Sequence, residues 1–160
     1  MSTVNIKRAD TIKDFEQGKA LFEEYAGSLN FDLGYQDFKK ELSTIAQQYK
    51  EPEGALLLCF IDDENAAGCA GVRKFAEGIA ELKRLYVKPG YRSLKIGKRL
   101  LESAIDTAKE LNYKFIRLDT VPGQTKAQEL YSYLGFYEIE AYRYSPIAGT
   151  IYFEKRLGEE

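Results

Sequence analysis

Apolar residues along this chain recur at strand spacing in some stretches and at helical spacing in others. Alternating or continuous apolar runs predict strands at residues 3–8, 55–61, 66–75, 81–87, 115–120, 136–144 and 150–156. Apolar residues three or four apart predict helices at 11–28, at 35–49, from a basic turn at 92–98 to Asn112, and at 124–134. Thr11, with Asp14 three positions later, is typical of a helix start, and Gly135 is typical of a helix end.

The order of these elements is β-α-α-β-β-β-α-β-α-β-β. It predicts an α/β fold, with a central twisted mixed sheet and helices on both faces. Short turns join the strands at 55–61, 66–75 and 81–87, so we expect an antiparallel meander there. The strand–helix–strand segment that follows should form a parallel, right-handed crossover. No linker or repeat interrupts residues 1–160, which predicts a single domain.

Charge and composition narrow the classes of function. The net charge is −2, which disfavours general binding of nucleic acid or of a membrane surface. The absence of histidine removes His-based triads and His metal sites. Cys59 and Cys69 lie in apolar runs, so we expect them to be buried, and two ligands cannot make a structural zinc site. We expect no metal, and a cytoplasmic protein, because the chain shows no signal core and no apolar run of membrane-spanning length.

The basic turn joins a strand to a helix through a Pro-Gly break at Pro89 and Gly90. The first amides of a helix have no partner inside the helix, and the helix dipole places partial positive charge there, so such a terminus binds anions. Arg92, Lys95 and Lys98 add charge to this one. The stretch therefore predicts a phosphate site, and the alternative is a solvated basic helix start.

The element order, the basic turn and a later A-x-x-L-Y-x-x-L-G-F at 127–136 resemble the GNAT superfamily of N-acetyltransferases. The resemblance implies acetyl-CoA as co-substrate and transfer of its acetyl group to an amine by direct attack. The family's phosphate loop reads Q/R-x-x-G-x-G/A, and here Arg92, Lys95 and Gly97 stand at those positions, so a lysine replaces the first glycine. The residues then expected to bind the cofactor are Leu85, Tyr86, Val87, Arg92, Ser93, Leu94, Lys95, Ile96, Gly97, Lys98 and Gln124.

The resemblance also implies an arrangement for the chemistry. The strands at 81–87 and 115–120 should splay apart, so that the pantetheine arm pairs with the freed edge and the Leu85 amide points at the thioester carbonyl. Glu81 stands where the family often has a catalytic base, although Lys83 on the same face would lower its pKa; the alternative is a structural ion-pair partner. Tyr131 stands where the family keeps a tyrosine that protonates the leaving thiolate. The alternative for Tyr131 is a packing role.

The acceptor is expected to be a small-molecule amine or an amino-acid-like metabolite. In the family, the acceptor site is built from the first helices and the late strands, here Tyr25, Leu29, Phe31, Tyr142 and Tyr144. Charged candidates for acceptor binding are Arg73, Arg84 and Asp119. An alternative function is a GNAT-like module that holds coenzyme A or a protein without turnover. A phosphate- or nucleotide-binding regulator fits less well, because no G-x-x-x-x-G-K-[ST] is present. The sequence leaves open whether the chain is a monomer or a homodimer.

Overall fold

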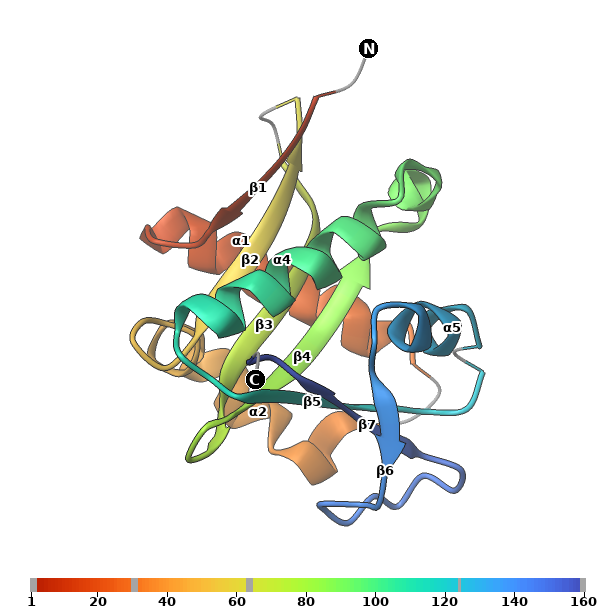
Figure 1. Cartoon of the computed structure of the whole chain (residues 1–160). Coiled ribbons are helices and arrows are strands. Elements are labelled where there is room, and N and C mark those ends of the chain that lie inside the picture. Colours follow the sequence, from red (N-terminus) through yellow and green to blue (C-terminus); the bar gives the residue numbers. More distant parts are fainter. Residues whose placement is uncertain (1–2, 30–31, 63–64, 124, 159–160) are drawn as a thin grey trace.

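A seven-stranded mixed sheet organises the computed structural model, which describes residues 3–29, 32–62, 65–123 and 125–158 (Figure 1). The strand order is β1-β2-β3-β4-β5-β7-β6. The strands are β1 (Val4–Arg8), β2 (Ala55–Ile61), β3 (Ala66–Ala76), β4 (Ile79–Val87), β5 (Phe115–Thr120), β6 (Tyr137–Ile139) and β7 (Ile151–Arg156). The helices are α1 (Ile12–Gly27), η1 (Leu33–Gln36), α2 (Phe38–Ser43), α3 (Ile45–Gln48), η2 (Pro89–Leu94), α4 (Ile96–Glu110) and α5 (Thr125–Tyr133).

The strand pairing confirms the predicted α/β class with its mixed sheet. β2, β3 and β4 form an antiparallel meander, and β4 pairs with β5 in parallel after the crossover through α4. Every other strand pair is antiparallel in the described sheet. The helix ends also follow the sequence, because the Thr11 hydroxyl accepts a hydrogen bond from the Asp14 amide and Gly135 has a φ of 98°.

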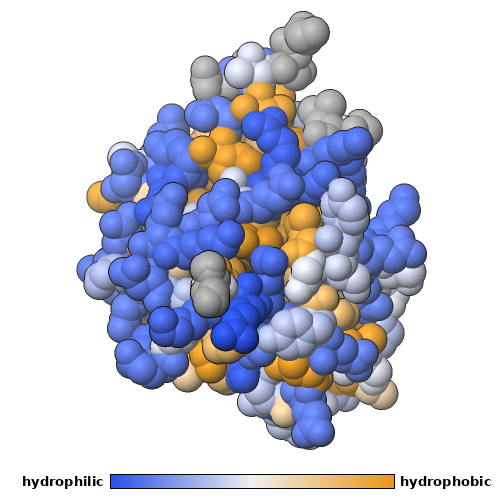
Figure 2. All heavy atoms as spheres, in the orientation of Figure 1, coloured by the Kyte–Doolittle hydropathy of each residue, from blue (hydrophilic) through white to orange (hydrophobic). Residues whose placement is uncertain are grey.

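Two hydrophobic clusters separate the layers of the fold. α4 and α5 pack on one face of the sheet, and α1, α2 and α3 pack on the other. β2 lies between them and is buried along its whole length, as its continuous apolar run predicts. Cys59 and Cys69 are both buried, one in each cluster, and neither forms a disulfide. Figure 2 shows that the outer surface over α4 is mainly hydrophilic, with apolar atoms in separate patches.

The predicted helix over 35–49 is not continuous, which corrects the sequence-based prediction. It is divided into η1, α2 and α3 by Asp37, with a φ of 59°, and by Thr44, with a φ of −124°. In a straight helix, residues eight positions apart would be separated by about 12 Å along the axis. The break instead brings the Tyr49 hydroxyl to within 2.6 Å of the Glu41 carboxylate.

The predicted strand over 136–144 is also shorter than expected, because β6 ends at Ile139. Beyond it the chain leaves the sheet. The Tyr142 ring packs against Phe75 and Tyr152, with ring centroids 4.9 and 5.0 Å apart, and Arg143 reaches β4. No helix in the described part of the chain is long and apolar enough to span a membrane.

Candidate functional site

The parallel strands β4 and β5 pair over only three residues each. Ile79–Glu81 pair with Phe115–Arg117, and then β4 continues beside β3 while β5 continues beside β7. Figure 1 shows the two strands diverging from this point. This confirms the expected splay. In the described sheet, the edge of β4 beyond Glu81 that faced β5 pairs with no strand, so its backbone N–H and C=O groups are available to an extended ligand.

β4 carries a bulge at Arg84. The φ of Arg84 is 59°, and the register with β3 shifts at this point. Neighbouring side chains of a strand normally point to opposite faces, and a bulge breaks that alternation. As a result Lys83 and Arg84, although adjacent in sequence, both interact with groups on the face that carries Glu81 and is covered by α2.

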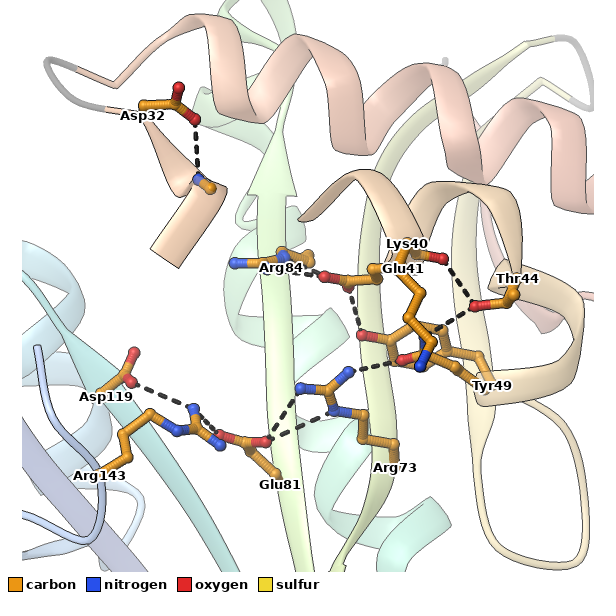
Figure 3. A network of polar contacts seen from close by, with 12 residues as sticks. Asp32, Lys40, Glu41, Thr44, Tyr49, Arg73, Glu81, Arg84, Asp119 and Arg143 are labelled. Carbon is orange, nitrogen blue, oxygen red and sulfur yellow. Dashed lines mark hydrogen bonds and ion pairs between the residues drawn. The ribbon is translucent and has the colours of Figure 1, made fainter. Parts of the chain in front are cut away.

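A buried ion pair holds the bulge in place (Figure 3). The Nη2 atom of Arg84 donates to Glu41 Oε1 at 2.7 Å, and its Nε atom donates to Oε2 at 3.3 Å. The Tyr49 hydroxyl donates to the same Oε2 at 2.6 Å. Burial by itself would raise the pKa of Glu41, but the charge of Arg84 outweighs it and lowers that pKa. The guanidinium also lies over the ring of Phe38, so α2 clamps β4 where β5 departs.

Glu81 sits at the centre of a second ionic cluster, at the last residue that pairs with β5 (Figure 3). Its side chain is 2% exposed and lies 2.5 Å from Arg143 Nη1 and 3.5 Å from Arg73 Nε. The Tyr142 hydroxyl lies at 3.5 Å from the same carboxylate. Burial would raise the pKa of Glu81, but the positive charges of Lys83, Arg143 and Arg73 lower it further than burial raises it. Glu81 is therefore ionised and strongly paired.

Lys83 lies between the two clusters and is 4% exposed. Burial and the charge of Arg84 lower its pKa, while the carboxylates of Glu81 and Asp119 oppose them, and the pKa falls to about 8. A buried amine of this kind is far easier to deprotonate than a surface lysine. The sequence analysis treated Lys83 only as a neighbour of Glu81, since strand periodicity gives no sign of its burial.

Tyr131 is held on α5 against the rings of Phe136 and Phe153. It is 7% exposed, and burial raises its pKa well above that of a free tyrosine, as do the charges of Tyr25 and Asp119. No hydrogen-bond partner of its hydroxyl is found in the described part of the chain, yet no fully buried side-chain polar atom there lacks one. The hydroxyl of this neutral phenol is therefore reachable from outside the core.

A cleft of about 590 Å³ lies over the other end of the parted edge. α1, α4 and α5 enclose it around the end of β4. Its lining includes Tyr25, Leu29, Leu85, Tyr86, Val87, Arg92, Lys95, Gly97, Lys98, Lys126, Ala127 and Leu130. Two contacts fix the α1 wall, since Glu24 accepts hydrogen bonds from Tyr86 and Lys88 at 2.7 Å each.

The basic turn leads into α4 through Lys95, which has a φ of 58°. This left-handed conformation favours glycine, which explains why the family has glycine at this position. Arg92 donates from Nε to the Val87 carbonyl at 2.9 Å, and Lys98 lies over the ring of Tyr133. The side chain of Ile96 is in the core, so only its backbone is suited to contact an anion. Five of these residues thus surround the start of α4.

The remaining predicted residues divide into three groups. Leu85, Tyr86, Val87, Arg92, Lys95, Gly97 and Lys98 meet in the cleft, as do Tyr25 and Leu29 from the predicted acceptor site. Ser93 and Leu94 belong to η2, and Gln124 and Phe31 lie outside the described residues. Tyr142 joins the Glu81 cluster, whereas Tyr144 is 81% exposed. Sequence reasoning missed Glu41 and Arg143, because each meets β4 only through the fold.

Comparisons with known proteins agree with this geometry. The sequence profile of the acetyltransferase (GNAT) family matches residues 19–136. An uncharacterized N-acetyltransferase of Schizosaccharomyces pombe is 31% identical over 159 residues, which cover 99% of this chain and 98% of that protein.

Solved structures share the fold. A GNAT-family acetyltransferase from Staphylococcus aureus Mu50 has a TM-score of 0.79 at 26% identity, over 98% of this chain and 100% of that one. The PaiA N-acetyltransferase of Thermoplasma acidophilum, solved in complex with coenzyme A, has a TM-score of 0.70 at 22% identity, over 96% and 99%. With its diverging β4 and β5 and its basic turn before α4, this chain belongs to the GNAT family of acetyltransferases.

Proposed function

We propose that this protein transfers the acetyl group of acetyl-CoA to the amine of a small, amino-acid-like acceptor, by direct attack of the amine on the thioester. The observation that carries the proposal is the parted edge of β4, which joins the ionic cluster at Glu81 to the cleft at the start of α4. Membership of the GNAT family and the coenzyme A complex of PaiA support the choice of donor.

The residues of the cleft fit coenzyme A. The parted edge from Leu85 to Val87 offers backbone groups for the pantetheine arm, in the manner of an added strand. The first amides of α4, with the charges of Lys95 and Lys98, suit its pyrophosphate. Acetyl-CoA would supply an acetyl group that is already activated as a thioester. Lys95 makes this turn more positive than a glycine would, which compensates for its less favourable backbone conformation.

At the acyl end, the chain has to stabilise negative charge on the carbonyl oxygen and to supply a proton to sulfur. The C–N bond forms and the C–S bond breaks, while the amine gives up a proton. We assign the Leu85 amide to the carbonyl oxygen, because it follows the bulge on the free edge. We assign Tyr131 to the sulfur, because its hydroxyl is neutral and is not engaged by the described residues. Its raised pKa favours hydrogen-bond donation first and proton transfer only as charge develops on sulfur.

Glu81 and Lys83 are the groups nearest to the amine's proton in this arrangement. The lowered pKa of Glu81 makes it a weak base and favours its alternative role as the ionic partner of Arg73 and Arg143. Glu81→Gln separates the two roles. A base would lose kcat with little change in stability, whereas an ionic partner would lose stability and acceptor affinity.

The proposal is tested with acetyl-CoA itself. Binding should raise Tm, because a ligand that binds only the folded state stabilises it by RT ln(1 + [L]/Kd). A mixture of small amines should then release free thiol from acetyl-CoA, which a thiol reagent detects. A protein that shows no shift in Tm at about millimolar acetyl-CoA is not a transferase of this kind. A shift without release of thiol on any amine would indicate a binding module instead.

A further inference from the structure

The floor of the site, where β4 leaves β5, carries more positive than negative charge. Among the described residues, three cations gather there, namely Arg73, Lys83 and Arg143. Two carboxylates face them, those of Glu81 and Asp119. An excess charge in a poorly solvated place is costly unless a ligand or solvent balances it.

The other two arginines of this region do not change that balance. Arg84 is matched by Glu41 at 2.7 Å, and Arg117 is matched by Glu154 at 2.8 Å. Each pair is closed and has no net charge. The excess therefore belongs to the cluster around Glu81.

The cations of this cluster are accessible, and its central carboxylate is not. A cavity of about 560 Å³ opens at the Glu81 end of the parted edge, and Arg73, Glu81 and Arg143 line it. The side chains of Arg73 and Arg143 are 23% and 25% exposed, against 2% for Glu81. A ligand that enters from this side meets guanidinium groups before it meets the carboxylate.

Arg143 is held in a position that suits a planar anion. Its guanidinium lies over the rings of Phe75 and Tyr142, at 5.8 and 5.2 Å from their centroids. Its carbonyl accepts a hydrogen bond from the Tyr152 hydroxyl at 2.9 Å. Only its Nη1 atom contacts the carboxylates of Glu81 and Asp119 among the described residues. Its other N–H donors are available for a fork-like contact with a second carboxylate.

We propose that the acceptor is an amine that also carries a carboxylate, and that Arg143 and Arg73 receive this carboxylate. The inference rests on the proposed function and names the substrate class of the same site. An amino acid with a neutral amine, the form that attacks, has a charge of −1 and balances the floor. A polyamine would add positive charge to a site that already has an excess. Burial of Lys83 on the same floor strengthens this preference, because its charge acts in a weakly screened environment.

The test is a panel of matched acceptors with acetyl-CoA and detection of free thiol. It contains amino acids and ω-amino acids, each beside its own amide, together with spermidine. For the preferred acceptor, kcat/KM should exceed that of its amide by about tenfold or more, since a charge-assisted contact is lost. Amides or spermidine used as well as the acids would overturn the inference and leave the proposed function standing. A chain that acetylates none of these amines would overturn both.

Variants at Arg143 assign the carboxylate contact. Arg143→Gln should raise KM for the acid by about tenfold and bring the ratio of acid to amide close to one, while KM for acetyl-CoA stays within about twofold. Arg143→Lys should recover part of that ratio. Lys109→Gln is the control, since it removes an exposed charge from the last turn of α4. A ratio that survives in Arg143→Gln, with Tm unchanged, would show that the carboxylate is not received there.

Discussion

Glu41→Gln tests whether the buried pair on α2 holds the bulge of β4. The substitution keeps the volume of the side chain, removes its charge and replaces one acceptor oxygen by a donor. Arg84 would then lose the partner of both Nη2 and Nε, and the Tyr49 hydroxyl would lose a charged acceptor. The remaining guanidinium is nearly inaccessible to water, with a side-chain exposure of 3%. The variant therefore leaves a buried charge without compensation.

The expected loss is large for a single substitution. Removal of one partner from a buried ion pair costs about 3–5 kcal/mol. In a domain of this size 1 kcal/mol corresponds to about 2–4 °C, so Tm should fall by roughly 6–20 °C. Because the folded pKa of Glu41 is lowered from 4.5, its contribution is complete above that value. It is lost as pH falls through the lowered pKa, so the difference between variant and parent should shrink in acid.

Urea unfolding at neutral pH and at about pH 3 measures both effects. Glu102→Gln, on the exposed face of α4, is the control and should change the free energy of unfolding by less than about 0.5 kcal/mol. The kcat of Glu41→Gln should fall more than its affinity for acetyl-CoA, because Arg84 fixes the residue before the Leu85 amide. A loss below about 1 kcal/mol, or a loss independent of pH, would refute the argument that this pair holds the bulge.

Three other substitutions test separate parts of the site. Tyr131→Phe should lower kcat by about 100-fold or more while acetyl-CoA affinity and Tm change little, and an unchanged kcat would remove the acid role. Lys95→Gly should raise the free energy of unfolding by about 1 kcal/mol, since it relieves a left-handed backbone, and should weaken acetyl-CoA binding. Lys95→Gln should weaken binding without that gain; tighter binding in Lys95→Gly would mean that the lysine impairs the turn. Gly71→Ala would place a Cβ at 2.5 Å from the Tyr49 ring and should cost about 1–3 kcal/mol, whereas Gly27→Ala meets nothing within 4 Å and should not destabilise the protein.

Local patterns in the chain were enough to predict most of the architecture. The strands at 55–61 and 115–120 have the predicted bounds, because apolar periodicity reports directly on burial by a sheet. The Thr11 cap and the Gly135 helix end also depend on a few neighbouring residues only. The donor half of the site is of the same kind, since a strand, a basic turn and a helix N-terminus follow one another in sequence.

The acceptor half depends on contacts between distant residues. The bulge at Arg84 is set by a carboxylate 43 positions away on α2, and the break at Thr44 allows that carboxylate and Tyr49 to meet. Arg143 reaches Glu81 because the chain leaves the sheet after Ile139. A residue pattern reports which side chains avoid water, but not which charge will face a given carboxylate after the chain has folded. Periodicity therefore specified the layers and the donor turn, whereas the balance of charge around Glu81 arises only when α2, α3 and the segment after β6 converge on β4.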